Sequence, residues 1–214
     1  MELEPKPRHN GQKIGLNEHI SVSSIKASEI AKLNHMGTKN LETERIFLRQ
    51  LKIDDANDVF SIKGDPTFHQ LQHCHKNIEE TINWLKYLQN IYKDNDVYHW
   101  GLELKSNKKI IGEIYQVRHF NEYKRFDVAY SINKNYWNNG YATEALSSII
   151  KYLIKTVGYN RIEANHYIDN PASGKVMEKA GMKKEGTLRQ YYKHWKNGKF
   201  IDVVFYSTIR DDII

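Results

Sequence analysis

The sequence predicts an α+β fold in which helices flank a mixed, mostly antiparallel sheet. Two observations lead to this class. Period-two alternation indicates strands, and apolar residues three and four apart indicate helices. Along the chain these patterns follow the order strand, helix, helix, three strands, helix, strand, helix, two strands. A length of 214 residues fits one domain plus an extension, and a hydrophobic share of 40% is enough for its core.

The first half of the chain supplies a strand, two helices and a hairpin. Residues 45–50 alternate as a strand, and Asp54 is predicted to cap the helix that follows. Residues 98–104 and 109–115 are expected to pair as a hairpin. Residues 77–92 form a second helix, because one face collects Ile78, Ile82, Leu85, Leu88, Ile91 and Tyr92.

The most informative segment joins a strand to a helix through Gly140. Residues 126–133 alternate as a strand, and the apolar residues of 142–157 fall on one helical face that ends at Gly158. A strand that turns through a glycine into a helix leaves backbone N–H groups unpaired at the positive end of the helix dipole, which predicts a phosphate or pyrophosphate site. The alternative is a tight turn that only packs the helix. The chain has neither a dinucleotide-binding fingerprint nor a P-loop.

A second strand–helix junction lies at Asn170. Residues 161–168 are predicted as a strand, Asn170 suits the N-cap of a short helix, and Pro171 suits its first position. Asn170 and Ser173 would therefore lie beside the first junction if the two strands are neighbours. The alternative roles are plain capping for Asn170 and a first-turn hydroxyl for Ser173. The last two strands are predicted at residues 183–188 and 200–207.

Residues 1–39 differ from the rest of the chain. Residues 1–17 are polar, punctuated by proline and glycine, and without apolar periodicity. After them, Ser23 or Ser24 could cap a short helix that uses Ile25, Ile30 and Leu33. We expect an N-terminal extension that is partly disordered, above all at residues 1–17, or that derives from a cloned leader. The domain is predicted to occupy residues 40–214.

Composition narrows the class of protein. No run approaches the length of a membrane span, and the first residues do not form a secretion signal, so we expect a cytoplasmic protein without a membrane partner. The single cysteine, Cys74, excludes an internal disulfide. A net charge of +6 favours anionic ligands, but no basic stripe with interleaved aromatic residues indicates nucleic-acid binding.

Three pieces of the chain together resemble the GCN5-related N-acetyltransferase (GNAT) superfamily, and more closely its branch that acetylates the N-termini of ribosomal proteins. The pieces are residues 41–49, residues 137–145, and residues 169–173 running into 178–186. Their order and spacing cover roughly residues 40–214. The family's acyl-CoA loop is usually written Arg/Gln-x-x-Gly-x-Gly/Ala. Gly140 and Ala142 match that pattern, whereas Trp137 replaces its first residue.

The resemblance implies a sheet splayed around an acetyl-CoA site, with the pantetheine arm between strands 126–133 and 161–168. Backbone groups of residues 130–133 would pair with the arm and polarise the thioester carbonyl, and the turn after Trp137 would hold the pyrophosphate. Asn170 would hydrogen-bond the arm. The expected donor-binding residues are Tyr130, Ser131, Ile132, Asn133, Asn138, Asn139, Gly140, Tyr141, Ala142, Thr143, Asn170 and Ser173.

Acetyl transfer to an amine also requires a base for the amine and an acid for the departing thiolate. Ser173 is the candidate acid. Asp127 and His166 on the two splayed strands, and Glu113 on the hairpin, are the candidate bases. Asp127 comes first because a carboxylate commonly occupies the matching position in the family. An α-amine, with a pKa of about 8, needs less help from a base than a lysine near 10.4.

The resemblance implies an acceptor pocket at the segment between the first two helices, and the last hairpin could form its opposite wall. His73 and His75 are candidates for one wall, or belong to a solvated loop. Tyr191 and Tyr192, in the predicted turn before the last strand, are candidates for the other wall, or aromatic residues that pack on one another. Imidazole and thiolate are zinc ligands, but no second group at metal spacing accompanies the cluster, so no metal is predicted. That cluster consists of His69, His73, Cys74 and His75.

The sequence therefore predicts an N-acetyltransferase that transfers an acetyl group from acetyl-CoA to a primary amine by direct attack in a ternary complex. The favoured acceptor is a protein N-terminal α-amine. The alternatives are a small-molecule amine, such as a polyamine, an amino sugar or an antibiotic, and a non-catalytic acyl-CoA-binding module. Cys74 lies outside the donor motifs and is not proposed as a nucleophile. We expect a monomer or a homodimer.

Overall fold

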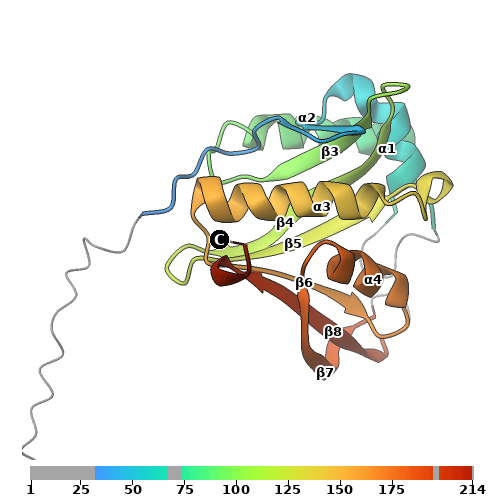
Figure 1. Cartoon of the computed structure of the whole chain (residues 1–214). Coiled ribbons are helices and arrows are strands. Elements are labelled where there is room, and N and C mark those ends of the chain that lie inside the picture. The colour runs from blue at the N-terminus through green and yellow to red at the C-terminus, as the bar shows by residue number, and fades with distance from the viewer. Residues whose placement is uncertain (1–31, 67–73, 195–197, 214) are drawn as a thin grey trace, which may run out of the picture. The chain divides into compact units, whose positions relative to one another are not determined.

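Eight strands form one sheet in the computed structural model, which describes residues 32–66, 74–194 and 198–213 (Figure 1). Their order across the sheet is β1-β2-β3-β4-β5-β6-β8-β7, and all neighbours are antiparallel except β5 and β6. The predicted α+β class is confirmed. The strands are β1 (Leu41–Glu42), β2 (Ile46–Arg49), β3 (His99–Leu104), β4 (Ile110–Phe120), β5 (Arg125–Ile132), β6 (Arg161–Tyr167), β7 (Lys183–Lys193) and β8 (Phe200–Ile209).

The parallel pair β5 and β6 separates along its length. The two strands pair at only three positions, of which Asp127 with Glu163 is the last. Beyond that position β6 keeps its antiparallel pairing with β8, and β5 keeps its pairing with β4. The backbone groups of β5 after Asp127 that face β6 are therefore left without a strand partner, so a ligand can pair with them.

Within the described ranges, four α-helices cover the two faces of the sheet. One face carries α3 (Tyr141–Tyr152) and α4 (Pro171–Lys179), and the other carries α1 (Ala56–Lys63) and α2 (Ile78–Ile91) (Figure 1). Leu146 of α3 is fully buried in the first core, and Leu85 of α2 is fully buried in the second. Each such leucine contributes about 1.5–3 kcal/mol by leaving water.

Helix α3 follows the predicted pattern closely. Its apolar positions Ala145, Leu146, Ile149 and Ile150 are all buried. A π-helical segment, Leu153–Val157, continues it to Gly158. That glycine has a φ of +101°, a left-handed conformation that suits glycine at a helix end.

Two local predictions were wrong. The aromatic pair Tyr191–Tyr192 lies within β7 and not in the turn, because the strand continues past an irregularity at Gln190. The Gln190 N–H donates to Asp202 Oδ1 of β8 at 2.7 Å, which holds the bulged strand to its partner. The N-cap residue of α1 is Asp55 and not Asp54, because a 3-10 turn, Ile53–Asp55, precedes the helix. The Asp55 carboxylate accepts from the Lys52 N–H at 2.7 Å and makes no capping bond to α1.

The residues just before β1 belong to the compact unit, which begins at Lys32. The Asn34 N–H donates to the Val157 carbonyl at 2.8 Å, and the Thr38 hydroxyl donates to the Val97 carbonyl at 3.0 Å. Residues 32–39 of the predicted extension are therefore folded onto the domain. The disorder expected at residues 1–17 lies outside the described residues. Across the described ranges, no helix has the length and apolar character needed to cross a bilayer.

Candidate active site

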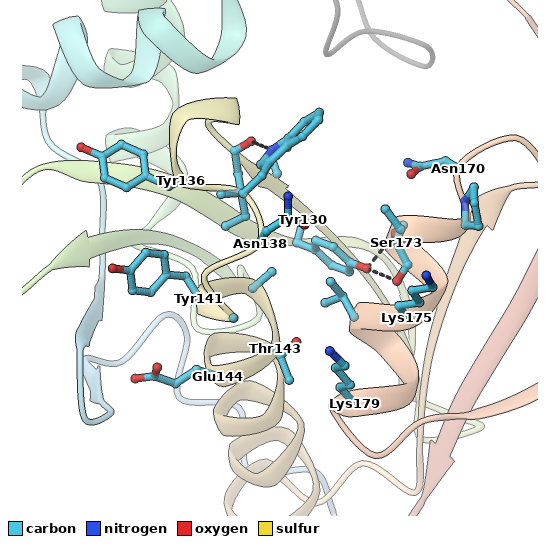
Figure 2. A pocket seen from close by; sticks show the side chains of 18 of the residues that line it. Tyr130, Tyr136, Asn138, Tyr141, Thr143, Glu144, Asn170, Ser173, Lys175 and Lys179 are labelled. Carbon is cyan, nitrogen blue, oxygen red and sulfur yellow. Dashed lines mark hydrogen bonds between the residues drawn. The ribbon is translucent and has the colours of Figure 1, made fainter.

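A cavity of about 760 Å³ lies where β5 and β6 separate, between the first turns of α3 and α4 (Figure 2). Ten of the twelve predicted donor-binding residues line it, so the two strand–helix junctions do meet at one site. The lining residues are Arg45, Tyr130, Ser131, Ile132, Tyr136, Trp137, Asn138, Gly140, Tyr141, Ala142, Thr143, Glu144, Asn170, Pro171, Ala172, Ser173, Lys175, Val176 and Lys179.

The turn into α3 presents backbone donors to this cavity. Gly140 has a φ of +79° and Asn138 a φ of +62°, which turns the chain sharply into the helix. The Glu144 N–H makes the first helical bond, to the Gly140 carbonyl at 3.0 Å. The N–H groups of Tyr141, Ala142 and Thr143 therefore have no acceptor within the helix, and they lie at its positive end. This geometry suits a diphosphate.

Arg45 and Glu144 hold that turn in place. The Glu144 carboxylate accepts from Arg45 Nε at 2.7 Å, from the Arg45 N–H at 2.9 Å and from the Thr43 hydroxyl at 2.6 Å. Arg45 also donates to the Asn139 carbonyl at 3.0 Å. Although burial opposes it, these hydrogen bonds lower the pKa of Glu144, so it stays an anion. A segment before β2 thus clamps the helix start.

Trp137 stands where the family pattern has arginine or glutamine. Its indole N–H donates to the Ile132 carbonyl at 2.7 Å, which ties the end of β5 to the turn. The residue is 53% exposed and lines the cavity. The first position of the loop therefore contributes an aromatic ring surface in place of the family's arginine or glutamine side chain.

Tyr130 of β5 and Ser173 of α4 meet across the cavity (Figure 2). The Tyr130 hydroxyl lies 2.7 Å from Ser173 Oγ and donates to the Ser173 carbonyl at 2.8 Å. Burial raises the pKa of Tyr130 well above its usual value, so the phenol stays protonated. Asn170 lines the same wall, and its side chain makes no capping hydrogen bond to α4. Its amide is therefore not used in plain capping.

Two predicted donor-binding residues point elsewhere. The Asn133 side chain donates to Ser61 Oγ at 2.9 Å and accepts from the Asn135 N–H, so it fastens the turn to α1. The Asn139 side chain donates to the Tyr136 and Trp137 carbonyls. Neither residue lines the cavity. Both stabilise the turn that precedes α3.

Asp127 lies at the point where β5 and β6 separate, outside the cavity lining. Arg118 donates to its Oδ2 from Nε at 2.9 Å and forms an ion pair with it at 2.7 Å. Its buried Oδ1 has no donor among the described residues. Burial raises the pKa of Asp127 to about 6, and the facing Glu163 adds to the rise. Two facing carboxyl groups can hydrogen-bond only when one of them is protonated.

Glu113 belongs to a buried charge cluster on the α1–α2 face. Lys63 Nζ lies 2.6 Å from Oε1, and His99 Nε2 lies 2.9 Å from Oε2. Burial alone favours the neutral acid, but these two partners lower the pKa of Glu113 to about 2. Such a carboxylate is a weak base, and the contacts favour a structural role. Its assignment as general base stays a prediction.

His166 lies beneath α4 and does not line the cavity. Its Nδ1 is 2.6 Å from the Tyr167 carbonyl, and its ring packs near Tyr206. The approach of α4 is so close that a Cβ added at Gly174 would lie 2.6 Å from His166 Nε2. Gly174 is thus needed for this packing, which favours a structural role for His166.

The predicted acceptor residues occupy two different places. His73 lies outside the described residues, whereas His75 Nδ1 is 2.8 Å from the Thr81 hydroxyl of α2. The rings of Tyr191 and Tyr192 pack edge to face at 4.8 Å, as the alternative interpretation proposed. No cluster of three or more His, Cys, Asp or Glu side chains suited to a metal occurs among the residues that the structure describes.

Sequence reasoning missed three features of the cavity. The Arg45–Glu144 contact joins residues 99 positions apart, so no local pattern marks it. Tyr130 was expected to act through its backbone, yet its hydroxyl reaches Ser173. Lys175 and Lys179 of α4 also line the cavity. Their spacing of four residues on one helix was the available signal.

Comparison with known proteins identifies the family. Residues 45–183, which include both junctions, match the family model described as an acetyltransferase (GNAT) domain. The chain belongs to the GNAT acetyltransferase family. It is thus an acyl-CoA-dependent N-acetyltransferase.

Named relatives agree with this assignment. The chain is 31% identical over 173 residues to the uncharacterized N-acetyltransferase YoaA of Bacillus subtilis, covering 79% of this chain and 96% of the relative. It is 30% identical over 109 residues to the ribosomal protein uS5-alanine N-acetyltransferase of Escherichia coli, covering 49% of this chain and 54% of that one. The crystal structure of the ribosomal-protein-S5-alanine acetyltransferase from Vibrio fischeri superposes with a TM-score of 0.70 at 24% identity, covering 81% and 98% of the two chains.

Proposed function

We propose that this GNAT enzyme transfers an acetyl group from acetyl-CoA to the α-amine at a protein N-terminus. One observation carries the choice of acceptor. Among the cavity-lining residues that the structure describes there is no histidine, and the one carboxylate, Glu144, is held by Arg45 and Thr43. A site without a free base at the donor suits an amine that is partly neutral near pH 8.

The donor substrate fits the cavity by its chemistry. Its diphosphate would accept from the N–H groups of Tyr141, Ala142 and Thr143, and its pantetheine arm would pair with the open edge of β5 toward Asn170. The free amide of Asn170 and the left-handed turn at Gly140 are the features that support this placement.

The reaction would proceed by direct attack. The amine nitrogen attacks the thioester carbon, and a backbone N–H near Ile132 stabilises the oxyanion. The C–N bond forms as the C–S bond breaks. The departing thiolate takes a proton from the Ser173 hydroxyl, which Tyr130 orients, and the serine regains a proton from solvent. The amine proton leaves to water, or through water to Asp127, which is ionised above a pKa of about 6.

The name of one relative supports this acceptor. The Escherichia coli relative is named a ribosomal protein uS5-alanine N-acetyltransferase, and it matches about half of this chain.

An acceptor panel scored by free thiol release tests the proposal. It compares four acceptors. The first is a peptide with a free N-terminus and an internal lysine, and the second is the same peptide with a formylated N-terminus. The other two are spermidine and an amino sugar. We expect release with the free N-terminus and a loss of at least tenfold on formylation. Faster release with spermidine or the amino sugar would favour the small-molecule alternative. Donor binding without release on any amine would favour the non-catalytic module.

A further inference from the structure

Two lysines of α4 line the donor cavity and have no role in the chemistry above. Lys175 and Lys179 are exposed, lie four residues apart and therefore share one side of the helix. Figure 2 shows Lys175 beside Ser173, and Lys179 opposite Thr143 of α3. Neither ammonium group forms an ion pair or a side-chain hydrogen bond within the described part of the chain.

Helix stability does not account for this pair. Like charges four residues apart repel and destabilise a helix slightly. Lys179 lies in the last turn of α4, where the helix dipole favours a cation, but Lys175 lies in the middle of the helix, where the dipole has little effect. A bound anion would remove the repulsion.

The other charged side chains of the cavity are already paired. The Arg45 guanidinium is held by Glu144 and by the Asn139 carbonyl, and Glu144 is held in return. Lys175 and Lys179 are therefore the cations that remain available to a ligand among the described lining residues. They lie on α4, across the cavity from the N–H donors of α3. The cavity thus has two separate anion-binding features.

The donor has two separate phosphate groups. The proposed function places the diphosphate at α3, which leaves the phosphomonoester on the ribose of coenzyme A. A phosphomonoester carries close to two negative charges at neutral pH, since its second pKa is about 6. We propose that Lys175 and Lys179 bind the ribose 3′-phosphate and make the enzyme selective for coenzyme A over 3′-dephospho-coenzyme A. This inference rests on the donor site of the proposed function.

Calorimetry with the two ligands tests the proposal without turnover. The proteins are the wild type, Lys175→Gln, Lys179→Gln and the double variant. Lys151→Gln is the matched control, because Lys151 is exposed on α3 and does not line the cavity. We expect the wild type to bind coenzyme A at least tenfold more tightly than the dephospho form. Each lysine substitution should weaken coenzyme A binding by about fivefold. Neither substitution should change the affinity for the dephospho form.

The double variant gives the deciding result. It should bind both ligands with the affinity that the wild type shows for the dephospho form, and the Lys151 control should behave as the wild type. Equal weakening for both ligands would overturn the proposal, because the lysines would then act on the diphosphate. A wild type that binds both forms equally well would also overturn it while leaving the donor site intact. A wild type that binds neither ligand would instead overturn the proposed function.

Discussion

The Tyr130 hydroxyl lies 2.7 Å from Ser173 Oγ, although the two residues come from a strand and a helix that are 43 positions apart. The contact joins β5 to α4 across the gap in the sheet, beside the place where the thioester would lie. Because burial keeps the phenol protonated, Tyr130 can orient the serine hydroxyl through their hydrogen bond.

Ser173→Ala should lower kcat by about 100-fold, because the leaving thiolate loses its proton donor. The affinity for acetyl-CoA should change less than about twofold, since the diphosphate contacts lie on α3. Tyr130→Phe should also lower kcat, by about tenfold, with the serine still present. Steady-state kinetics and calorimetry separate the two quantities. A Ser173→Ala variant with wild-type kcat would remove Ser173 from the mechanism.

Glu144→Gln should loosen the turn that carries the diphosphate donors. The neutral amide weakens the bonds from Arg45 and Thr43, which hold the start of α3. We expect the Kd for acetyl-CoA to rise about tenfold, while the free energy of unfolding falls by about 1 kcal/mol. Glu178→Gln is a suitable control, because Glu178 lies on α4 outside the cavity. Unchanged affinity in Glu144→Gln would show that the clamp does not support the donor site.

Asp127 should make stability depend on pH in a defined window. Its pKa is raised from 3.8 to about 6 in the folded protein, so the folded state binds the extra proton. The associated stability is fully present below pH 3.8 and is lost as pH rises through about 6. Asp127→Asn carries an amide that can donate to Glu163 at every pH. The free energy of unfolding of Asp127→Asn, relative to the wild type, should therefore increase between pH 4 and pH 6.

Urea unfolding of the two proteins at several pH values measures that difference. A constant difference from pH 4 to pH 8 would contradict a raised pKa of Asp127 in the folded protein. Asp127→Asn also tests the role of Asp127 in catalysis.

If Asp127 accepts the amine proton through water, Asp127→Asn lowers the plateau of kcat/KM. The midpoint of the pH profile of kcat/KM, which the pKa of the substrate's α-amine sets, should stay near pH 8.

Much of the site was readable from local sequence. The strand, the glycine turn and the amphipathic helix around Gly140 are short-range features, and their burial pattern follows from spacing alone. The N-cap pattern at Asn170 likewise located the start of α4. These two junctions are enough to place the cavity.

Contacts between distant segments were not readable in this way. Nothing near Arg45 in the chain indicates Glu144, and nothing near Tyr130 indicates Ser173, because each pair meets only once the sheet has formed. Side-chain direction was a second limit. Asn133 and Asn139 sit in the expected segment, yet the tight turn uses their amides for its own hydrogen bonds.

Calorimetry of acetyl-CoA binding to the wild type and to Gly140→Val tests the central claim most directly. The claim is that the turn before α3 holds the donor's diphosphate. A β-branched residue at a φ of +79° is strained and shifts the backbone donors, so we expect the affinity to fall by at least tenfold while the variant remains folded by circular dichroism. Wild-type affinity in Gly140→Val would place the diphosphate elsewhere and contradict the account.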